Sequence, residues 1–149
     1  MSGAARLDAF EDELRSRLDG LATVTREHVH NYPKPDLYDV VVTIEPVNPA
    51  SAPISWIASD VDVVLSVGRG NWPRWELALD DLGFDELDNL VKAAIDGRVR
   101  ETFGWHRSFV EVLHEDGQVE RSTGGGLLGL VPLPGWKWWG RHVRYEPYA

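Results

Sequence analysis

Residues 38–45 read YDVVVTIE, and this stretch decides the fold class because its side chains alternate between two faces. One face carries Tyr38, Val40, Val42 and Ile44, and the other carries Asp39, Val41, Thr43 and Glu45. A period of two, with a high content of β-branched residues, is typical of a β-strand. The stretch therefore predicts a strand at the centre of the first half of the chain.

Further strands are predicted on both sides of residues 38–45. The same alternation or β-branched composition marks residues 24–30, 54–58, 61–67, 74–79, 99–103, 109–113, 118–122 and 141–146. The pair Asp116-Gly117 favours a hairpin turn, and residues 54–58 and 61–67 are close enough to pair as a second hairpin. Residues 31–36 (NYPKPD) and 68–71 (GRGN) are expected to form turns, and residues 124–126 (GGG) a flexible segment.

Two stretches follow the helical period instead. The first has apolar residues at Leu7, Phe10, Leu14 and Leu18 and is expected to end at Gly20. The second has an apolar face of Leu87, Leu90, Val91, Ala94 and Ile95; we expect Asp85 as its N-cap and Gly97 as its stop. The order of elements predicts an α+β fold in which two helices pack on a mainly antiparallel sheet of about 6 to 8 strands. One compact domain is expected over residues 1–149, with a strand order that the sequence does not give.

Composition excludes several functional classes. The chain has 149 residues, 43% of them hydrophobic, and no cysteine, which rules out disulfides, thiolate nucleophiles and cysteine-ligated metals. The N-terminus places acids where a secretion signal needs an apolar stretch, and no apolar run approaches the ~20 residues that cross a bilayer. A cytoplasmic protein without membrane association is the expectation.

The charge of the chain is negative and unevenly distributed. The net charge is −9, and residues 1–96 hold 18 acidic against 8 basic residues. An acidic surface repels phosphate backbones, so the charge disfavours nucleic acid and favours a basic protein partner. Five acids lie close together near the second predicted helix, at Asp80, Asp81, Asp85, Glu86 and Asp88. A helix N-terminus uses one or two acids, so this excess predicts a partner-binding surface, with an ordinary solvated face as the alternative.

Seven tryptophans are an unusual number for this length, and three of them stand together as Trp136, Trp138 and Trp139. In a strand Trp136 and Trp138 would share a face, with Trp139 on the other. Such rings can stack on a sugar, on a base or in a protein interface, or they can cap an open sheet edge. Trp56, Trp72, Trp75 and Trp105 are expected in the core or at its edge.

Two weaker pairs could carry chemistry. His28 and His30 would lie on one strand face, as the start of a metal site, and Asp60 and Asp62 would aim two carboxylates to one side. The simpler interpretation is that both pairs are solvated, because no third ligand or calcium loop accompanies them. Residues 68–71 lack the Lys-Ser/Thr of a phosphate-binding loop, and no serine-hydrolase elbow is present. No catalytic residue, metal or cofactor is therefore assigned.

A resemblance points in the same direction as the charge. Residues 64–72 (VLSVGRGNW), residues 75–77 (WEL) and residues 87–100, with their AIDGRV ending, resemble small acidic bacterial domains of unassigned role. Some of these are similar to immunity proteins of polymorphic toxin systems. The resemblance implies a cytoplasmic inhibitor that captures a basic toxin without catalysis. The alternative is a small-molecule or carbohydrate-binding domain that uses the C-terminal tryptophans, and a third possibility is an enzyme using His28, His30 or the Asp60/Asp62 pair.

Overall fold

The computed structural model describes residues 2–29, 40–70, 72, 74–126 and 131–149. These residues form three helices, namely α1 (Gly3–Arg17), α2 (Asp81–Ile95) and α3 (Trp136–Trp139). They also form nine strands, namely β1 (Ala22–His28), β2 (Val40–Pro46), β3 (Ile54–Ala58), β4 (Asp62–Val67), β5 (Trp75–Ala78), β6 (Val99–Gly104), β7 (Arg107–Leu113), β8 (Val119–Gly125) and β9 (Arg141–Arg144).

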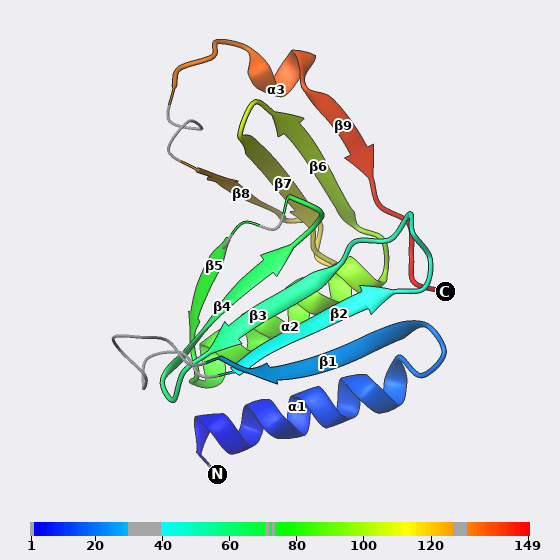
Figure 1. Ribbon diagram of the computed structural model, residues 1–149, viewed down its shortest axis with the longest axis vertical. Helices are drawn as coiled ribbons and strands as arrows, with labels where there is room; N and C mark the ends of the chain where they lie inside the picture. The colour runs from blue at the N-terminus through cyan, green and yellow to red at the C-terminus, as the bar shows by residue number, and fades with distance from the viewer. Residues whose placement is uncertain (1, 30–39, 71, 73, 127–130) are drawn as a thin grey trace.

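The strands form two antiparallel sheets (Figure 1). The first is a meander of five strands in the order β1-β2-β3-β4-β5, and the second has four strands in the order β8-β7-β6-β9. α2 connects the two sheets in the chain, and β9 returns after α3 to pair with β6. The α+β class is confirmed, but the prediction of one sheet with two helices is wrong, because the chain after α2 starts a sheet of its own.

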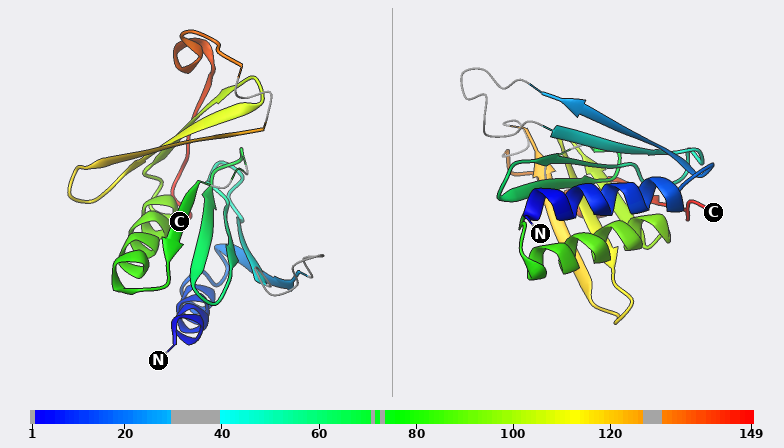
Figure 2. Two further views of the ribbon diagram at one scale, coloured as in Figure 1. Left: turned by 90° about the vertical axis from the view of Figure 1, so that its left-hand side faces the viewer. Right: turned by 90° about the horizontal axis from the view of Figure 1, so that it is seen from below.

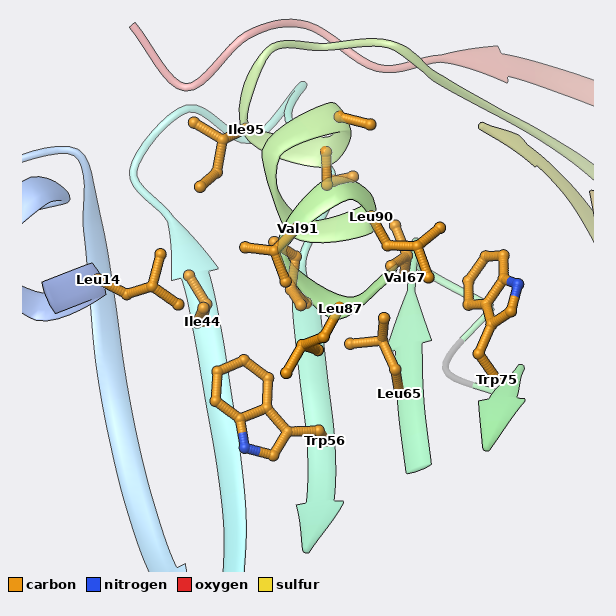
Figure 3. Packing of buried hydrophobic residues seen from close by; sticks show 14 of the residues in the cluster. Leu14, Ile44, Trp56, Leu65, Val67, Trp75, Leu87, Leu90, Val91 and Ile95 are labelled. Atoms are coloured by element: carbon orange, nitrogen blue, oxygen red, sulfur yellow. The ribbon is translucent and has the colours of Figure 1, made fainter. Parts of the chain in front are cut away.

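Both long helices cover the same face of the five-stranded sheet (Figure 2). Alternate residues of the strands point toward them, and Ile44, Trp56, Leu65 and Val67 are each at most 1% exposed. Leu14 of α1 and Leu87 and Val91 of α2 face these side chains (Figure 3). The same cluster includes Val110 and Val112 of the second sheet, so one hydrophobic core joins the two sheets.

α2 begins earlier than the sequence predicts. Its N-cap is Asp80, whose carboxylate accepts a hydrogen bond from the Gly83 backbone N–H at 2.8 Å, and Asp85 already lies inside the helix. Glycine generally disfavours a helix, but at position 83 it lets the first turn of α2 approach the end of β5 closely. A Cβ at this position would collide with the carbonyl oxygen of Ala78. The predicted stop is confirmed, since Gly97 has φ +73° directly after the helix.

Two expectations about the second half of the chain are wrong. Gly124 and Gly125 are not part of a free segment, because they belong to β8 and pair with Ser108 and Arg107. Trp105 is 48% exposed, in the turn between β6 and β7, whereas Trp56 and Trp75 are buried as expected. The predicted turn at residues 31–36, the Tyr38-Asp39 start of the second strand and His30 lie outside the described residues.

A buried polar cluster lies where the two sheets meet. Arg74, before β5, pairs with Glu101 of β6 at 2.7 Å, and both side chains are fully buried. Glu101 also accepts hydrogen bonds from the backbone N–H of Arg69 (2.8 Å) and from the Tyr145 hydroxyl (2.5 Å). Ser108 of β7 is hydrogen-bonded to Arg74 as well. The carboxylate of Glu101 therefore ties the turn after β4 to the second sheet.

The helices of the described chain are short relative to a bilayer: none has the length and apolar character that crossing a membrane requires.

Candidate functional site

One hollow lies on the sheet face opposite the helices. It measures about 490 Å³ and is lined by outward residues of β2, β3 and β4 such as Thr43, Ser55 and Ser66. Arg69 and Glu45 also belong to its lining. This surface is a mixture of hydroxyls and aliphatic side chains, and its charges are of both signs. It has the character of an open sheet face, without a concentration of chemically active groups.

A second hollow, of about 400 Å³, is strongly acidic. It lies between α2 and the β7–β8 hairpin, and we call it the acidic cleft. Its lining consists of Glu86, Asn89, His114, Glu115, Asp116, Gln118 and Glu120. The cleft thus combines four carboxylates with a single imidazole. The guanidinium group of Arg98 lies 3.9 Å from the carboxylate of Glu115. It lies closer to the carboxylate of Asp96, at 3.1 Å.

The local fold explains how these groups come together. Gly117, with φ +86°, closes the turn, and Asp116 stabilises it by accepting a hydrogen bond from the Gln118 backbone N–H at 2.9 Å. His114 and Glu120 then face each other across the hairpin, with Nε2 of the imidazole 2.8 Å from the carboxylate. The hairpin therefore presents its acids on the side that faces α2.

Glu86 completes the cleft from α2. It shares a hydrogen bond with Glu120, and its pKa is raised above the usual range, first by burial and then by this bond and the negative charge of Glu120. The charge interaction with His114 acts to lower the pKa of Glu86. Two carboxyl groups in contact compete for charge, so this pair gains from any cation that approaches it.

The five acids singled out in the sequence do not form one surface. Asp80 caps α2, Asp81 pairs with Arg6 of α1 at 2.6 Å, and Asp88 pairs with Lys92 at 3.3 Å. Asp85 and Asp88 line a groove of about 380 Å³ between α1 and α2, which also contains Arg6, Arg17 and Lys92. Glu86 alone of the five lines the acidic cleft. The helix period explains the separation, because residues 81, 85 and 88 share a face that residue 86 does not.

The tryptophans at the C-terminus form the short helix α3 and not a strand. Trp136 is buried, with its ring over Gly104 of β6, where an added Cβ would lie 2.6 Å from the ring. Trp138 and Trp139 remain 88% and 59% exposed. The indole N–H of Trp139 donates to the Pro134 carbonyl at 3.2 Å, which fixes that ring. The condition under which Trp136 and Trp138 would share a strand face is therefore not met, and one ring is buried while the other is in solvent.

His28 and Asp60 come together at a small cavity of about 160 Å³ beside α1. Asp62 does not line it, and its carboxylate bonds Ser59 at 2.5 Å. Within the described part of the chain, no group of three His, Asp or Glu residues has the arrangement of a metal site. The possible pairing of His28 with His30 is not described.

Sequence reasoning missed His114, Glu115, Asp116 and Glu120 as functional candidates. The turn pattern Asp116-Gly117 predicts a hairpin, but a two-residue turn would put residues 114 and 120 on opposite faces, and they meet only because Val112 pairs with Glu120 in the observed register. The turn pattern gives no information on α2, which is distant in sequence and meets the hairpin only through the packing of the second sheet. A charge count across the hairpin, four acids in residues 111–120, is the one feature that could have drawn attention to it.

Comparisons with protein-family models, with curated proteins and with solved structures find no match to this chain.

Proposed function

We propose that this chain is a protein-binding module that captures a basic partner through the acidic cleft. The observation that carries the proposal is the convergence of Glu86, Glu115, Asp116 and Glu120 on one hollow from two separate elements. A hollow with one sign of charge concentrates the potential, steers an oppositely charged partner and accepts an inserted Lys or Arg. The acids singled out beside α1 contribute less, because Arg6 and Lys92 neutralise part of their charge.

The resemblance to immunity proteins gives this partner a class. We propose a cytoplasmic inhibitor that occupies the cationic surface of a toxin and blocks it by contact. Nothing in this role needs a cofactor. Trp138 and Trp139, on α3, are exposed aromatic side chains of the type that often anchors a protein interface.

A peptide of ten arginines tests the cleft, with binding measured by calorimetry at two salt concentrations. The cleft variant Glu86→Gln/Glu115→Gln/Asp116→Asn/Glu120→Gln is compared with a control, Asp12→Asn/Asp19→Asn/Glu27→Gln/Asp60→Asn. Both remove four negative charges, and the control acids are exposed and outside the cleft. We expect the cleft variant to bind at least ten times more weakly than the control. Equal losses would mean that net charge alone attracts the peptide, and the proposal would fail.

The toxin assignment has its own test. A basic toxin encoded beside this protein is produced together with it in a bacterium, and survival is measured. The wild type and the control variant should protect the cell, while the cleft variant should not. Protection by the cleft variant at the wild-type level would remove the cleft from this role.

A second candidate function is the binding of a carbohydrate by the exposed rings of Trp138 and Trp139. The observation in its favour is their exposure on a four-residue helix, since sugars stack on aromatic faces in such positions. Titration with oligosaccharides should then shift tryptophan emission in the wild type and not in Trp138→Ala/Trp139→Ala. An unchanged emission across the series would count against this candidate.

A further inference from the structure

The face of the four-stranded sheet that points away from the core carries several arginines. Both neighbours of Glu111 in β7 point into the hydrophobic core, so Glu111 itself points outward. Arg100 of β6 and Arg121 of β8 are the register partners of Glu111 and lie on this same outer face. Arg144 of β9 is in turn the partner of Arg100. All three arginines are exposed, so the outer face is basic although the chain as a whole is acidic.

Two of these arginines face each other without a partner of opposite charge. Arg100 and Arg144 occupy opposite positions in the antiparallel pair of β6 and β9, where like charges destabilise a sheet. Neither guanidinium group has an ion pair or a hydrogen bond with another of the described residues. Arg121, by contrast, pairs with Glu111 at 3.3 Å. The fold thus leaves two neighbouring cations whose charge an anion would neutralise.

Both unpaired arginines line one hollow of about 120 Å³. Arg98 also lines it but adds little free charge, because its guanidinium group donates to the Leu113 carbonyl at 2.7 Å and pairs with Asp96 at 3.1 Å. Glu111 is the one carboxylate of the lining, and its pairing with Arg121 neutralises part of its charge. The hollow is therefore cationic on the side of β6 and β9.

The other side of the hollow is aliphatic. Leu113 of β7 and Val119 of β8 are register partners across the hairpin, and both belong to the lining. They are 45% and 40% exposed, so a ligand can reach them. Because β6 lies between β7 and β9 (Figure 1), the hollow extends across the sheet from these two side chains to the arginines. It therefore suits a molecule with an anionic group at one end and an apolar group at the other.

The chemistry of arginine indicates which anion fits. A guanidinium group recognises phosphate through the parallel N–H groups of its planar fork. A phosphate monoester carries about 1.5 to 2 negative charges at pH 7, which matches two unpaired cations. We propose that this hollow binds a small phosphate monoester, whose phosphate contacts Arg100 and Arg144 and whose organic group contacts Leu113 and Val119. The site is separate from the acidic cleft, since the two hollows share no lining residue.

A nuclear magnetic resonance titration of ¹⁵N-labelled protein tests the proposal. The ionic strength is held constant, because salt screens exposed charges. The probes are phenyl phosphate, methyl phosphate, which lacks the ring, and phenyl sulfate, which carries a single charge. We expect phenyl phosphate to shift the backbone signals of β6 and β9 saturably, and the other two to bind at least about threefold more weakly. No saturable shift, or equal affinity of either comparison compound, would overturn the proposal.

Two arginines of β9 provide a matched pair of variants. Arg144 and Arg141 are both exposed, but only Arg144 lines the hollow, and Arg141 lies over the Phe103 ring. Arg144→Gln and Arg141→Gln each remove one positive charge. We expect Arg144→Gln to weaken the binding of phenyl phosphate at least about fivefold, and Arg141→Gln to change it less than about twofold. Equal losses would mean that net charge alone attracts the anion, and the proposal would fail.

Two further variants check the location independently of Arg144. Arg100→Gln, also at an exposed position, should weaken binding as much as Arg144→Gln does. Glu111→Gln removes the one carboxylate of the lining and should strengthen binding at least about twofold. Glu76→Gln makes the same change at an exposed position on β5 and should leave the affinity unaltered. Full affinity in Arg100→Gln, or the same affinity in both glutamate variants, would contradict the site.

Discussion

The carboxyl groups of Glu86 and Glu120 hold one another in a hydrogen bond between α2 and β8, and burial is the first cause of the raised pKa of Glu86. The folded protein therefore binds this proton more tightly than the unfolded chain does. A raised carboxyl pKa stabilises the fold at low pH, and the contribution is lost as the pH rises through the raised value. For Glu86 this loss therefore occurs at a pH above the usual carboxyl range, which lies at about pH 4.

Glu86→Gln should remove this dependence, because the amide still donates to Glu120 and does not ionise. We expect the free energy of unfolding of the wild type to fall relative to that of the variant as the pH rises from about 4 to 7. At pH 7 the variant should be the more stable by about 0.2–1 kcal/mol, the range for exposed charge pairs. Urea denaturation at several pH values measures this. Glu76→Gln, exposed on β5, is the control and should follow the wild type; parallel curves for Glu86→Gln would contradict the argument.

The buried pair of Arg74 and Glu101 leads to a larger expected effect. Burial lowers the pKa of Arg74, while the Glu101 carboxylate acts to raise it, and Glu101 also accepts three further hydrogen bonds. In Glu101→Gln the amide nitrogen of the new side chain would face the groups that donate hydrogen bonds to Glu101. The charge of Arg74 would also stay buried without its carboxylate partner. We expect a loss of about 3–5 kcal/mol of stability, measured by chemical denaturation. Arg74→Met/Glu101→Gln should be more stable than the single variant; a single variant within about 1 kcal/mol of wild type would refute this role.

At the scale of elements, the start of α2 depends on one glycine. The first turn of the helix lies against the end of β5, and an added Cβ at Gly83 would meet the backbone carbonyl of Ala78. Because backbone cannot move aside as a side chain can, Gly83→Ala should destabilise the protein by about 1–3 kcal/mol despite the better helix propensity of alanine. Asn89→Ala, exposed on the same helix, should be neutral or slightly stabilising. Thermal denaturation compares the two, and an equal melting temperature for both would show that the contact is unimportant.

The same glycine shows where sequence reasoning reached its limit. Periodicity alone predicted the apolar face of α2, the Gly97 stop and the pairing of β3 with β4, since these depend on residues that are close in sequence. It placed the N-cap five residues late, at Asp85, because the packing of Gly83 against the end of β5 is a tertiary contact that no local pattern indicates. It assigned no element to residues 136–139, because alternating tryptophans satisfy a period of two as well as a helical turn.

For the whole molecule, long-range packing determines which charges share a surface. The acidic cleft combines Glu86 with a hairpin about thirty residues further along the chain, and no local pattern connects them. Conversely, Asp81 and Asp88 are neighbours of Glu86 in sequence but belong to a face with basic partners. A cluster counted along the chain therefore does not predict which acids share a surface, because that depends on how the second sheet packs against α2.

The C-terminal residues connect the two sheets after β9. The backbone N–H of Tyr145 donates to Val99, that of Tyr148 donates to Ile95 at 2.9 Å, and the buried Tyr148 hydroxyl donates to Ala52 at 2.6 Å. Burial, followed by the charge of Glu45, raises the pKa of Tyr148, so it remains a neutral donor at physiological pH. This segment therefore contacts the β2–β3 connection and the end of α2 together, and it should make the two sheets unfold as one unit.

Tyr148→Ala tests that coupling. Loss of a buried aromatic ring should cost about 3–5 kcal/mol, whereas Tyr148→Phe, which loses only the hydroxyl, should cost about 0.5–1.5 kcal/mol. Native-state hydrogen exchange then distinguishes local from global opening. In the wild type the amides of β3 and β6 should exchange through a common opening. In Tyr148→Ala those of β6 and β9 should exchange faster than those of β3, because the second sheet can then open alone. Equal acceleration in both sheets would mean that the C-terminal segment adds stability without coupling them.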